Sequence, residues 1–208
     1  MKKILVTGSQ GYIGKHLIKM LRQTGFYDVY RLDKIDTPEP NYLWANITNR
    51  DDLKSYLFEM NGLPTEYDAI IHLAALVQVG QSVEYPTAYY NTNINGTNWL
   101  RNIVQHKKFI FASTGAAEGM ASPYAISKKV AEDMLIEQEP ECTIFRFYNV
   151  IGSEGFEPTN PDGLFFNLIK SIFENWDKFR TLLKFSDEYP TTDVVYAMAV
   201  QILGVENC

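Results

Sequence analysis

The chain has 208 residues, of which 46% are hydrophobic and 21% charged, values typical of a soluble globular protein with a sizeable core. Its net charge of −6 argues against a nucleic-acid surface, and its apolar runs are too short to span a bilayer. Two cysteines are too few for a disulfide framework, and the N-terminus lacks a signal-peptide pattern, so we expect a cytoplasmic protein.

The first predicted unit is a strand, a turn and a helix within Lys2–Leu17, which reads KKILVTGSQGYIGKHL. The turn carries three glycines at a spacing of three, Gly8, Gly11 and Gly14, and apolar residues then recur at helical spacing. Glycines here allow a tight turn, approach to a pyrophosphate and close contact between helix and strand. Since a helix N-terminus presents free N–H groups to phosphates, the turn predicts a dinucleotide site. A purely structural turn is the alternative.

The second predicted strand ends in Asp33, which is 33 − 14 = 19 residues after the last glycine. At a separation of about 20 residues a carboxylate accepts hydrogen bonds from the adenosine ribose. A carboxylate there repels a 2′-phosphate, so NAD is favoured over NADP. Arg31 and Lys34 lie close by and leave NADP open as the alternative.

Strand-like and helical segments alternate along the chain. We expect strands at 3–6, 28–32, 42–44, 69–73, 109–112 and 143–147, and helices at 11–24, 50–60, 87–106 and 124–137. This alternation predicts an α/β fold, a Rossmann-like, doubly wound and mainly parallel sheet with helices on both faces. Residues 1–152 are expected to form the nucleotide-binding domain with the catalytic residues. Residues 153–208 are expected to form a reduced substrate-binding cap, not an independent domain.

A candidate proton-transfer site follows the apolar strand that begins at Phe109. This strand ends in Ser113 and Thr114, and Tyr124 and Lys128 follow on a predicted helix. Positions four apart share one helix face, so the phenol and the ammonium are expected to point into one site. A nearby ammonium lowers the pKa of a phenol, which can then take a proton from a sugar or alcohol hydroxyl. A chance Tyr–Lys pair is the alternative interpretation.

The motifs together resemble the extended short-chain dehydrogenases/reductases. Within that family they resemble the nucleotide-sugar 4-epimerases of the UDP-glucose 4-epimerase type. The segments that carry the resemblance are TGSQGYIG (7–14), HLAALVQVGQS (72–82), NINGT (93–97), YAISK (124–128) and RFYNVIG (146–152). The resemblance implies an NAD-dependent isomerase of carbohydrate metabolism whose substrate is a nucleotide sugar.

The resemblance also implies the site residues. Its cofactor-binding positions are Gly8, Gly11, Tyr12, Ile13, Gly14, Asp33, Asn46, Ile47, Leu73, Ala74, Ala75, Tyr124 and Lys128. Tyr124 is implied as the base, Lys128 holds the nicotinamide ribose, and Thr114 hydrogen-bonds the reacting hydroxyl. Ser113, Thr114 and Asn149 are the implied substrate contacts.

The implied mechanism involves no net oxidation or reduction. The base takes the proton of the C4 hydroxyl while hydride passes to NAD, which gives a transient 4-keto sugar. The keto sugar turns over in the site, and hydride returns to its other face. Dehydratases of the family carry an Asp-Glu pair where this chain has Gly115-Ala116, so dehydration is not expected.

Two alternatives to the epimerase stay open. The first is a non-catalytic or weakly active NAD-binding sensor or regulatory relative, which the reduced cap favours. The second is an NAD(P)H-dependent keto-sugar reductase. The histidines lack metal-ligand spacing, so no metal site is expected. The resemblance further implies a homodimer through the helices near 87–106 and 124–137.

Overall fold

The structure, a computed structural model, describes residues 1–59, 64, 66–148 and 150 of the chain. The chain divides into two compact units, Met1–Tyr148 and Asn149–Cys208. The predicted cap at 153–208, the boundary after residue 152 and the substrate residue Asn149 lie outside the described residues, and they stay predictions. None of the described helices is long and apolar enough to cross a membrane.

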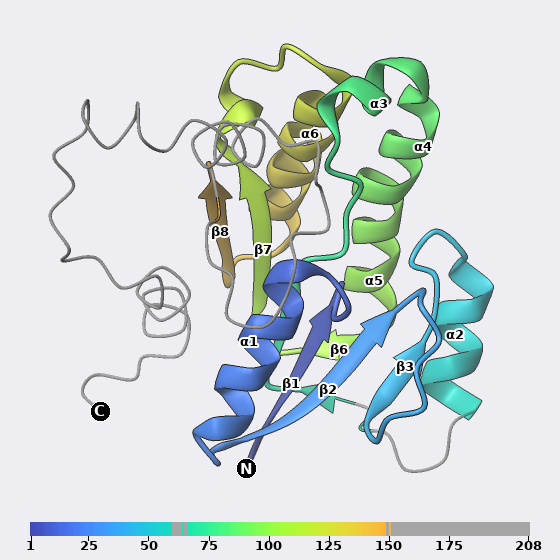
Figure 1. Cartoon of the computed structure of the whole chain (residues 1–208), viewed down its shortest axis with the longest axis vertical. Helices are drawn as coiled ribbons and strands as arrows, with labels where there is room; N and C mark the ends of the chain where they lie inside the picture. Colours follow the sequence, from blue (N-terminus) through green and yellow to red (C-terminus); the bar gives the residue numbers. More distant parts are fainter. Residues whose placement is uncertain (60–63, 65, 149, 151–208) are drawn as a thin grey trace, which may run out of the picture. The chain divides into compact units, whose positions relative to one another are not determined.

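The first unit is built on a six-stranded sheet with the order β3-β2-β1-β5-β7-β8, in which every pairing is parallel (Figure 1). The strands are β1 (Lys2–Thr7), β2 (Tyr27–Asp33), β3 (Tyr42–Trp44), β5 (Ala69–His72), β7 (Phe109–Thr114) and β8 (Cys142–Phe147). All six strands were predicted. The chain leaves β1 towards β2 and β3, then returns to the other side of β1 at β5. Ligands of open α/β sheets bind beside such a switch point, at the carboxyl ends of the strands.

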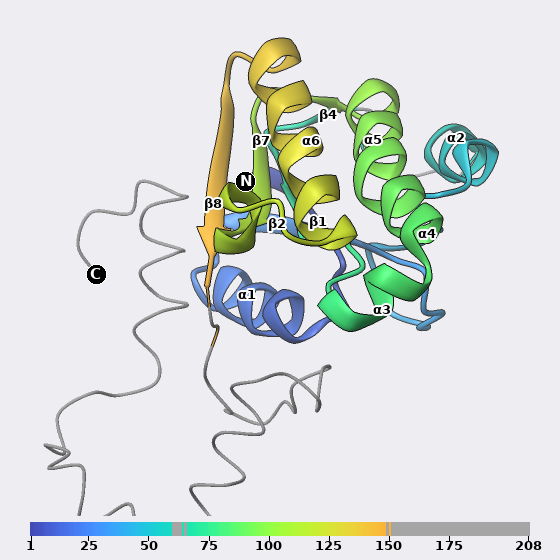
Figure 2. The same cartoon turned by 90° about the horizontal axis from the view of Figure 1, so that it is seen from above.

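Helices cover both faces of this sheet, as predicted. Figure 2 shows α1 (Tyr12–Gln23) on one face and α4 (Pro86–Tyr90), α5 (Thr97–Ile103) and α6 (Pro123–Gln138) on the other, with α2 (Arg50–Glu59) beside α5. Local sequence explains where α6 begins. Ser122 accepts a hydrogen bond from Ala125 N at 3.1 Å, and Pro123 has the fixed φ that suits a first helical residue.

The single helix predicted over 87–106 is wrong. A π-helix, η1 (Asn91–Gly96), separates α4 from α5, and the chain then enters β6 (Gln105–His106). This strand pairs in parallel with β4 (Glu66–Tyr67) in a second small sheet, and Lys107 N donates to Tyr67 O at 3.1 Å. Pairing with a strand distant in sequence therefore ends the helix. The sequence prediction also missed α3 (Val79–Glu84) and the 3₁₀ turn η2 (Gly115–Glu118).

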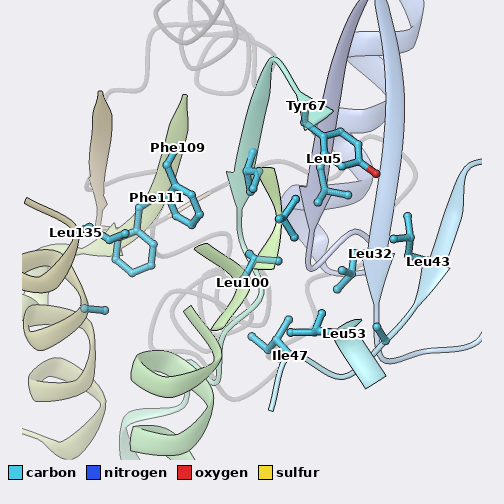
Figure 3. Close-up of a cluster of buried hydrophobic side chains, with 14 residues drawn as sticks. Leu5, Leu32, Leu43, Ile47, Leu53, Tyr67, Leu100, Phe109, Phe111 and Leu135 are labelled. Carbon is cyan, nitrogen blue, oxygen red and sulfur yellow. The ribbon is translucent and has the colours of Figure 1, made fainter. Parts of the chain in front are cut away.

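The hydrophobic core fills the space between the sheet and the helices α2, α5 and α6. Figure 3 shows it extending from Leu135 and Phe111 beside α6 to Leu43 and Leu53 at the other end. All four side chains have no exposed surface. Burying such a side chain contributes roughly 1.5–3 kcal/mol, so this core holds the strand ends, and the residues after them, in fixed positions.

Two glycines with positive φ make a matched pair for testing the turn after β1. Gly8 has a φ of 65°, and a Cβ on it would lie 2.7 Å from Ala74 N, whereas at Gly25, with a φ of 68°, a Cβ meets nothing within 4 Å. Gly25→Ala is expected to cost about 1 kcal/mol of unfolding free energy through backbone strain. Gly8→Ala is expected to cost at least about 2 kcal/mol, because the turn must also move away from Ala74. Urea denaturation measures both losses, and equal losses would contradict the close approach.

Candidate active site

The glycine turn connects the carboxyl end of β1 to the N-terminus of α1. Gly11 precedes this helix, no described side chain caps it, and its first turn carries no acidic residue. Its N–H groups and the positive end of its dipole are therefore free to bind an anion such as a phosphate. A Cβ on Gly14 would overlap Gly8 O, so this glycine is needed for the close approach of α1 to the turn after β1. Tyr12 and Ile13 are the first two residues of α1.

Asp33 ends β2, and its carboxylate lies against the glycine turn. Its Oδ2 accepts a hydrogen bond from Gln10 N at 2.9 Å, and its Oδ1 accepts one from Ile35 N at 3.2 Å. The carboxylate is thus fixed beside the N-terminus of α1, at the edge of the sheet where the predicted cofactor binds. The arrangement fits the ribose-binding role predicted for Asp33.

Arg31, one of the two basic residues that left NADP open, has its charge engaged elsewhere. Its side chain is buried and donates to Glu39 Oε2 at 2.6 Å and to Pro40 O at 3.1 Å. A 2′-phosphate would have to compete with the Glu39 carboxylate for this guanidinium. The structure therefore favours NAD over NADP.

Replacing Asp33 by alanine is expected to weaken NAD binding about tenfold or more, because hydrogen bonds to a charged acceptor contribute about 1.5–3 kcal/mol. The preference for NAD over NADP is expected to narrow as well. Isothermal titration calorimetry with each nucleotide measures both effects. Asp36→Ala, which removes an exposed carboxylate three residues further on, is the matched control. Equal affinities for NAD in the two variants would rule out the assigned role.

The other predicted cofactor contacts follow β3 and β5. Leu73–Ala75 lie opposite the glycine turn, where Leu73 N donates to Thr7 O and Ala74 N donates to Thr7 Oγ1, both at 3.2 Å. Asn46 is exposed, with its Oδ1 accepting from Thr48 N and Oγ1, and Ile47 is buried in the core. The structure thus places Leu73–Ala75 at the switch point and gives Ile47 a role in the core.

Thr114 ends β7, and Tyr124 and Lys128 lie on the first two turns of α6, which packs against β7. The phenol of Tyr124 shares a hydrogen bond with Thr114, and its ring makes an edge contact with Tyr89 at 6.3 Å between centroids. The Lys128 Nζ lies 4.0 Å from the centroid of the Phe111 ring, and the side chain is 3% exposed. Thr114 and Lys128 are thus buried beside β7, and Tyr124, which is half-buried, lies next to Thr114.

The predicted lowering of the Tyr124 pKa is wrong. Burial raises the pKa of Tyr124, and the hydrogen bond with Thr114 opposes that rise only in part. Burial also lowers the pKa of Lys128 to about 7, so much of its charge is lost near neutral pH. Sequence spacing identified the pair, but burial decides the direction of both pKa shifts.

A buried polar chain that the sequence prediction missed connects the glycine turn to η1. Thr97 Oγ1 donates its one proton to Asn93 O at 2.7 Å. In its contact with His72 Nε2 at 2.9 Å the same oxygen is therefore the acceptor. The imidazole therefore carries its proton on Nε2, and its Nδ1 accepts from Thr7 Oγ1 at 2.7 Å. Burial lowers the pKa of His72 to about 3, which keeps it neutral. In the described residues His72 is thus a structural link, and none of the described acidic, His and Cys side chains form a group suited to a metal ion.

Asn93 continues this chain to α6. Its Oδ1 accepts from Leu76 N, and its Nδ2 donates to Leu76 O and to Ser127 Oγ, each at 2.9 Å. The segment after β5 is thereby tied to the residue beside Lys128. A π-helix often marks a functional site, and the NINGT motif around Asn93 was the available sequence signal.

A second missed group is a cluster of charges around Arg146 in β8. Its guanidinium donates to both carboxylate oxygens of Glu132, at 2.9 and 2.6 Å, and to Glu118 at 3.0 Å. Glu132 is 1% exposed, and the hydroxyl of Ser113, predicted as a substrate contact, is buried beside it. The signal was available, because Glu132 follows Lys128 by four residues on the same helix face.

The fold and this site together define a class, a Rossmann-fold protein of the short-chain dehydrogenase/reductase type. The family model described as the NAD dependent epimerase/dehydratase family matches residues 4–200, and the chain belongs to that family. NAD is the family's cofactor, in agreement with the glycine turn and Asp33.

Curated relatives include UDP-glucose 4-epimerases. The protein of Neisseria meningitidis serogroup B is 29% identical over 232 residues, which cover 93% of this chain and 67% of the relative. That of Haemophilus influenzae is 31% identical over 227 residues, which cover 91% of this chain and 66% of the relative. The chain thus spans about two thirds of the length of these proteins.

Solved structures of UDP-glucose 4-epimerases have the same fold. The Thermotoga maritima enzyme with UDP-glucose has a TM-score of 0.62 at 28% identity, over 77% of this chain and 59% of that chain. The Thermus thermophilus enzyme in complex with NAD has a TM-score of 0.60 at 27% identity, over 78% of this chain and 58% of that chain.

Proposed function

We propose that the protein is an NAD-dependent nucleotide-sugar epimerase that inverts C4 of a UDP-hexose through a transient 4-keto sugar. The observation that carries the proposal is that Tyr124 lies next to Thr114 at the carboxyl end of β7, with Lys128 one turn further along α6. Similarity to UDP-glucose 4-epimerases supports the substrate class. A sensor without turnover has no need for a lysine buried in a setting as apolar as that of Lys128.

Each residue of the triad has a distinct role in the proposal. Tyr124 takes the proton of the C4 hydroxyl and later returns it, and Thr114 orients that hydroxyl. Lys128 donates to the nicotinamide ribose and, when charged, favours the phenolate of Tyr124. NAD, when bound, supplies the acceptor and then the donor of one hydride. Gly8, Gly11, Gly14 and Asp33 hold the cofactor, and Ser113 and Asn149 remain proposed substrate contacts.

The residue after Thr114 favours epimerisation over dehydration. A Cβ on Gly115 would overlap the ring of Tyr148, so an aromatic ring occupies the space that a side chain there would need. Elimination of water requires a general acid and a general base beside the sugar. Gly115 and Ala116, the two residues after Thr114, supply neither group, which agrees with an epimerase.

The test is to incubate the purified chain with NAD and a panel of UDP-, GDP- and dTDP-sugars, and to follow the anomeric signals by NMR. The 4-epimer of one UDP-sugar is expected to appear without net NADH. Consumption of added NADH would favour the reductase. Binding of NAD without any turnover would favour the sensor. The proposed homodimer through helices α4–α5 and α6 is tested separately, by light scattering.

A further inference from the structure

We propose that Glu132 is a positioning residue whose carboxylate stabilises the ammonium form of Lys128. Arg146 holds the Glu132 carboxylate in the place where it does so. The proposal rests on the proposed function in that Lys128 is a cofactor-binding residue. It adds two residues, from α6 and β8, that neither the motifs nor the similarity to epimerases assigns to the site.

The geometry that supports the proposal is a row of alternating charges. Lys128 and Glu132 lie one helical turn apart on α6, and are 3% and 1% exposed. Arg146 reaches Glu132 with two parallel hydrogen bonds, from Nε to Oε1 at 2.9 Å and from Nη2 to Oε2 at 2.6 Å. Its third nitrogen, Nη1, binds Glu118 Oε1 at 3.0 Å. Such a bidentate pair fixes both position and orientation of the carboxylate.

The surroundings of Lys128 make a carboxylate necessary if the ammonium is to persist. The face of Phe111 in β7 attracts the cation weakly, and burial strongly disfavours it. His72 in β5 is neutral, and Tyr124 on α6, whose pKa burial raises, is protonated. Among the described residues around it, Glu132 therefore supplies the stabilising negative charge, and it raises the Lys128 pKa against burial.

Arg146 keeps Glu132 ionised although the carboxylate is buried. Its hydrogen bonds and charge lower the pKa of Glu132, against the effect of burial. A buried carboxylate without a partner would take up a proton and lose its effect on Lys128. Arg146 also joins β8 to η2, directly after Thr114, through Glu118. A role confined to that structural connection would affect stability alone and would leave the titration of Lys128 unchanged.

The test follows the titration of Lys128 by NMR of protein labelled with ¹³C at lysine Cε, and its signal is identified by its loss in Lys128→Met. In the unmodified chain the midpoint is expected near pH 7. Glu132→Gln is expected to lower it by about one pH unit or more. The double variant Glu132→Gln with Arg146→Gln removes both charges, so that the guanidinium is not left without its carboxylate. Its Lys128 midpoint is expected to fall by the same amount.

The matched control is Glu139→Gln, which removes the carboxylate that binds Arg101 at 2.9 Å, away from the triad. It is expected to leave the Lys128 midpoint unchanged. A shift in both Glu132 variants and not in the control supports the proposal, and an unchanged midpoint in a folded Glu132 variant overturns it. Because the titration needs neither NAD nor turnover, failure of the proposed function and failure of this inference are separate results.

Discussion

Replacing Tyr124 by phenylalanine is expected to reduce epimerisation by about a hundred- to ten-thousandfold, the usual contribution of a positioned acid–base group. The substitution removes the hydroxyl that shares a hydrogen bond with Thr114 and keeps the ring that packs against Tyr89. NAD affinity is therefore expected to stay close to that of the unmodified protein, and loss of the hydrogen bond is expected to cost about 1 kcal/mol of unfolding free energy. Initial rates of epimer formation and calorimetric titration with NAD measure the two quantities separately.

The neighbouring tyrosine provides the control for this prediction. Tyr89 is buried, and its hydroxyl donates to Gln78 O at 2.7 Å, so it has a structural hydrogen bond of its own. Tyr89→Phe is expected to lower stability by about 1 kcal/mol and to change the rate less than tenfold. Comparable rates for the Tyr124 and Tyr89 variants would show that the Tyr124 hydroxyl is not the proton-transfer group.

Replacing Lys128 by methionine is expected to abolish function and yet stabilise the fold near neutral pH. Burial lowers the pKa of Lys128 from 10.5 to about 7 in the folded chain. Each unit of such a shift corresponds to about 1.4 kcal/mol, so a gain of roughly 2–4 kcal/mol in unfolding free energy is expected. Methionine fills a similar volume and carries no charge that burial removes from water. The lysine thus lowers stability at this position in exchange for its proposed function.

The pH dependence of this gain has a definite sign. As the pH falls from 10.5 to 7, the unfolded chain binds a proton at Lys128 and the folded chain does not, so the unmodified protein loses stability over this interval. The advantage of Lys128→Met is thus full below pH 7 and disappears towards pH 10.5. Urea denaturation across this range measures it. Lys129→Met, which removes a partly exposed lysine paired with Asp133, is expected to change stability by less than about 0.5 kcal/mol at any pH. A gain independent of pH would contradict the burial of a titrating amine.

The sequence predicted those parts of the fold and site that depend on local patterns. The glycine turn, the six strands and the Tyr124–Lys128 pair follow from periodicity and spacing over a few residues. The break at η1 was missed because it involves hydrogen bonds between segments distant in sequence, such as Asn93 to Leu76 and Ser127. Neither partner looks exceptional in the sequence alone.

Charge interactions were harder to predict, because they depend on burial. The spacing of Tyr124 and Lys128 predicted a lowered phenol pKa, but the structure places both groups away from water, which raises one pKa and lowers the other. Arg31 and Lys34 left NADP open in the sequence, yet the guanidinium of Arg31 is engaged by Glu39. Arg146 and Glu132 are 14 residues apart, so their pairing follows from the crossing of α6 and β8.

The most direct test of the central claim uses a UDP-hexose that carries deuterium at C4. The purified chain is incubated with this sugar and NAD in ordinary water, and the product is examined by NMR while absorbance at the NADH band is recorded. The proposed function predicts the C4 epimer with its deuterium retained at C4 and no net NADH, since the same hydride leaves and returns. Loss of deuterium to solvent during epimerisation, or NADH accumulating in proportion to product, would contradict it.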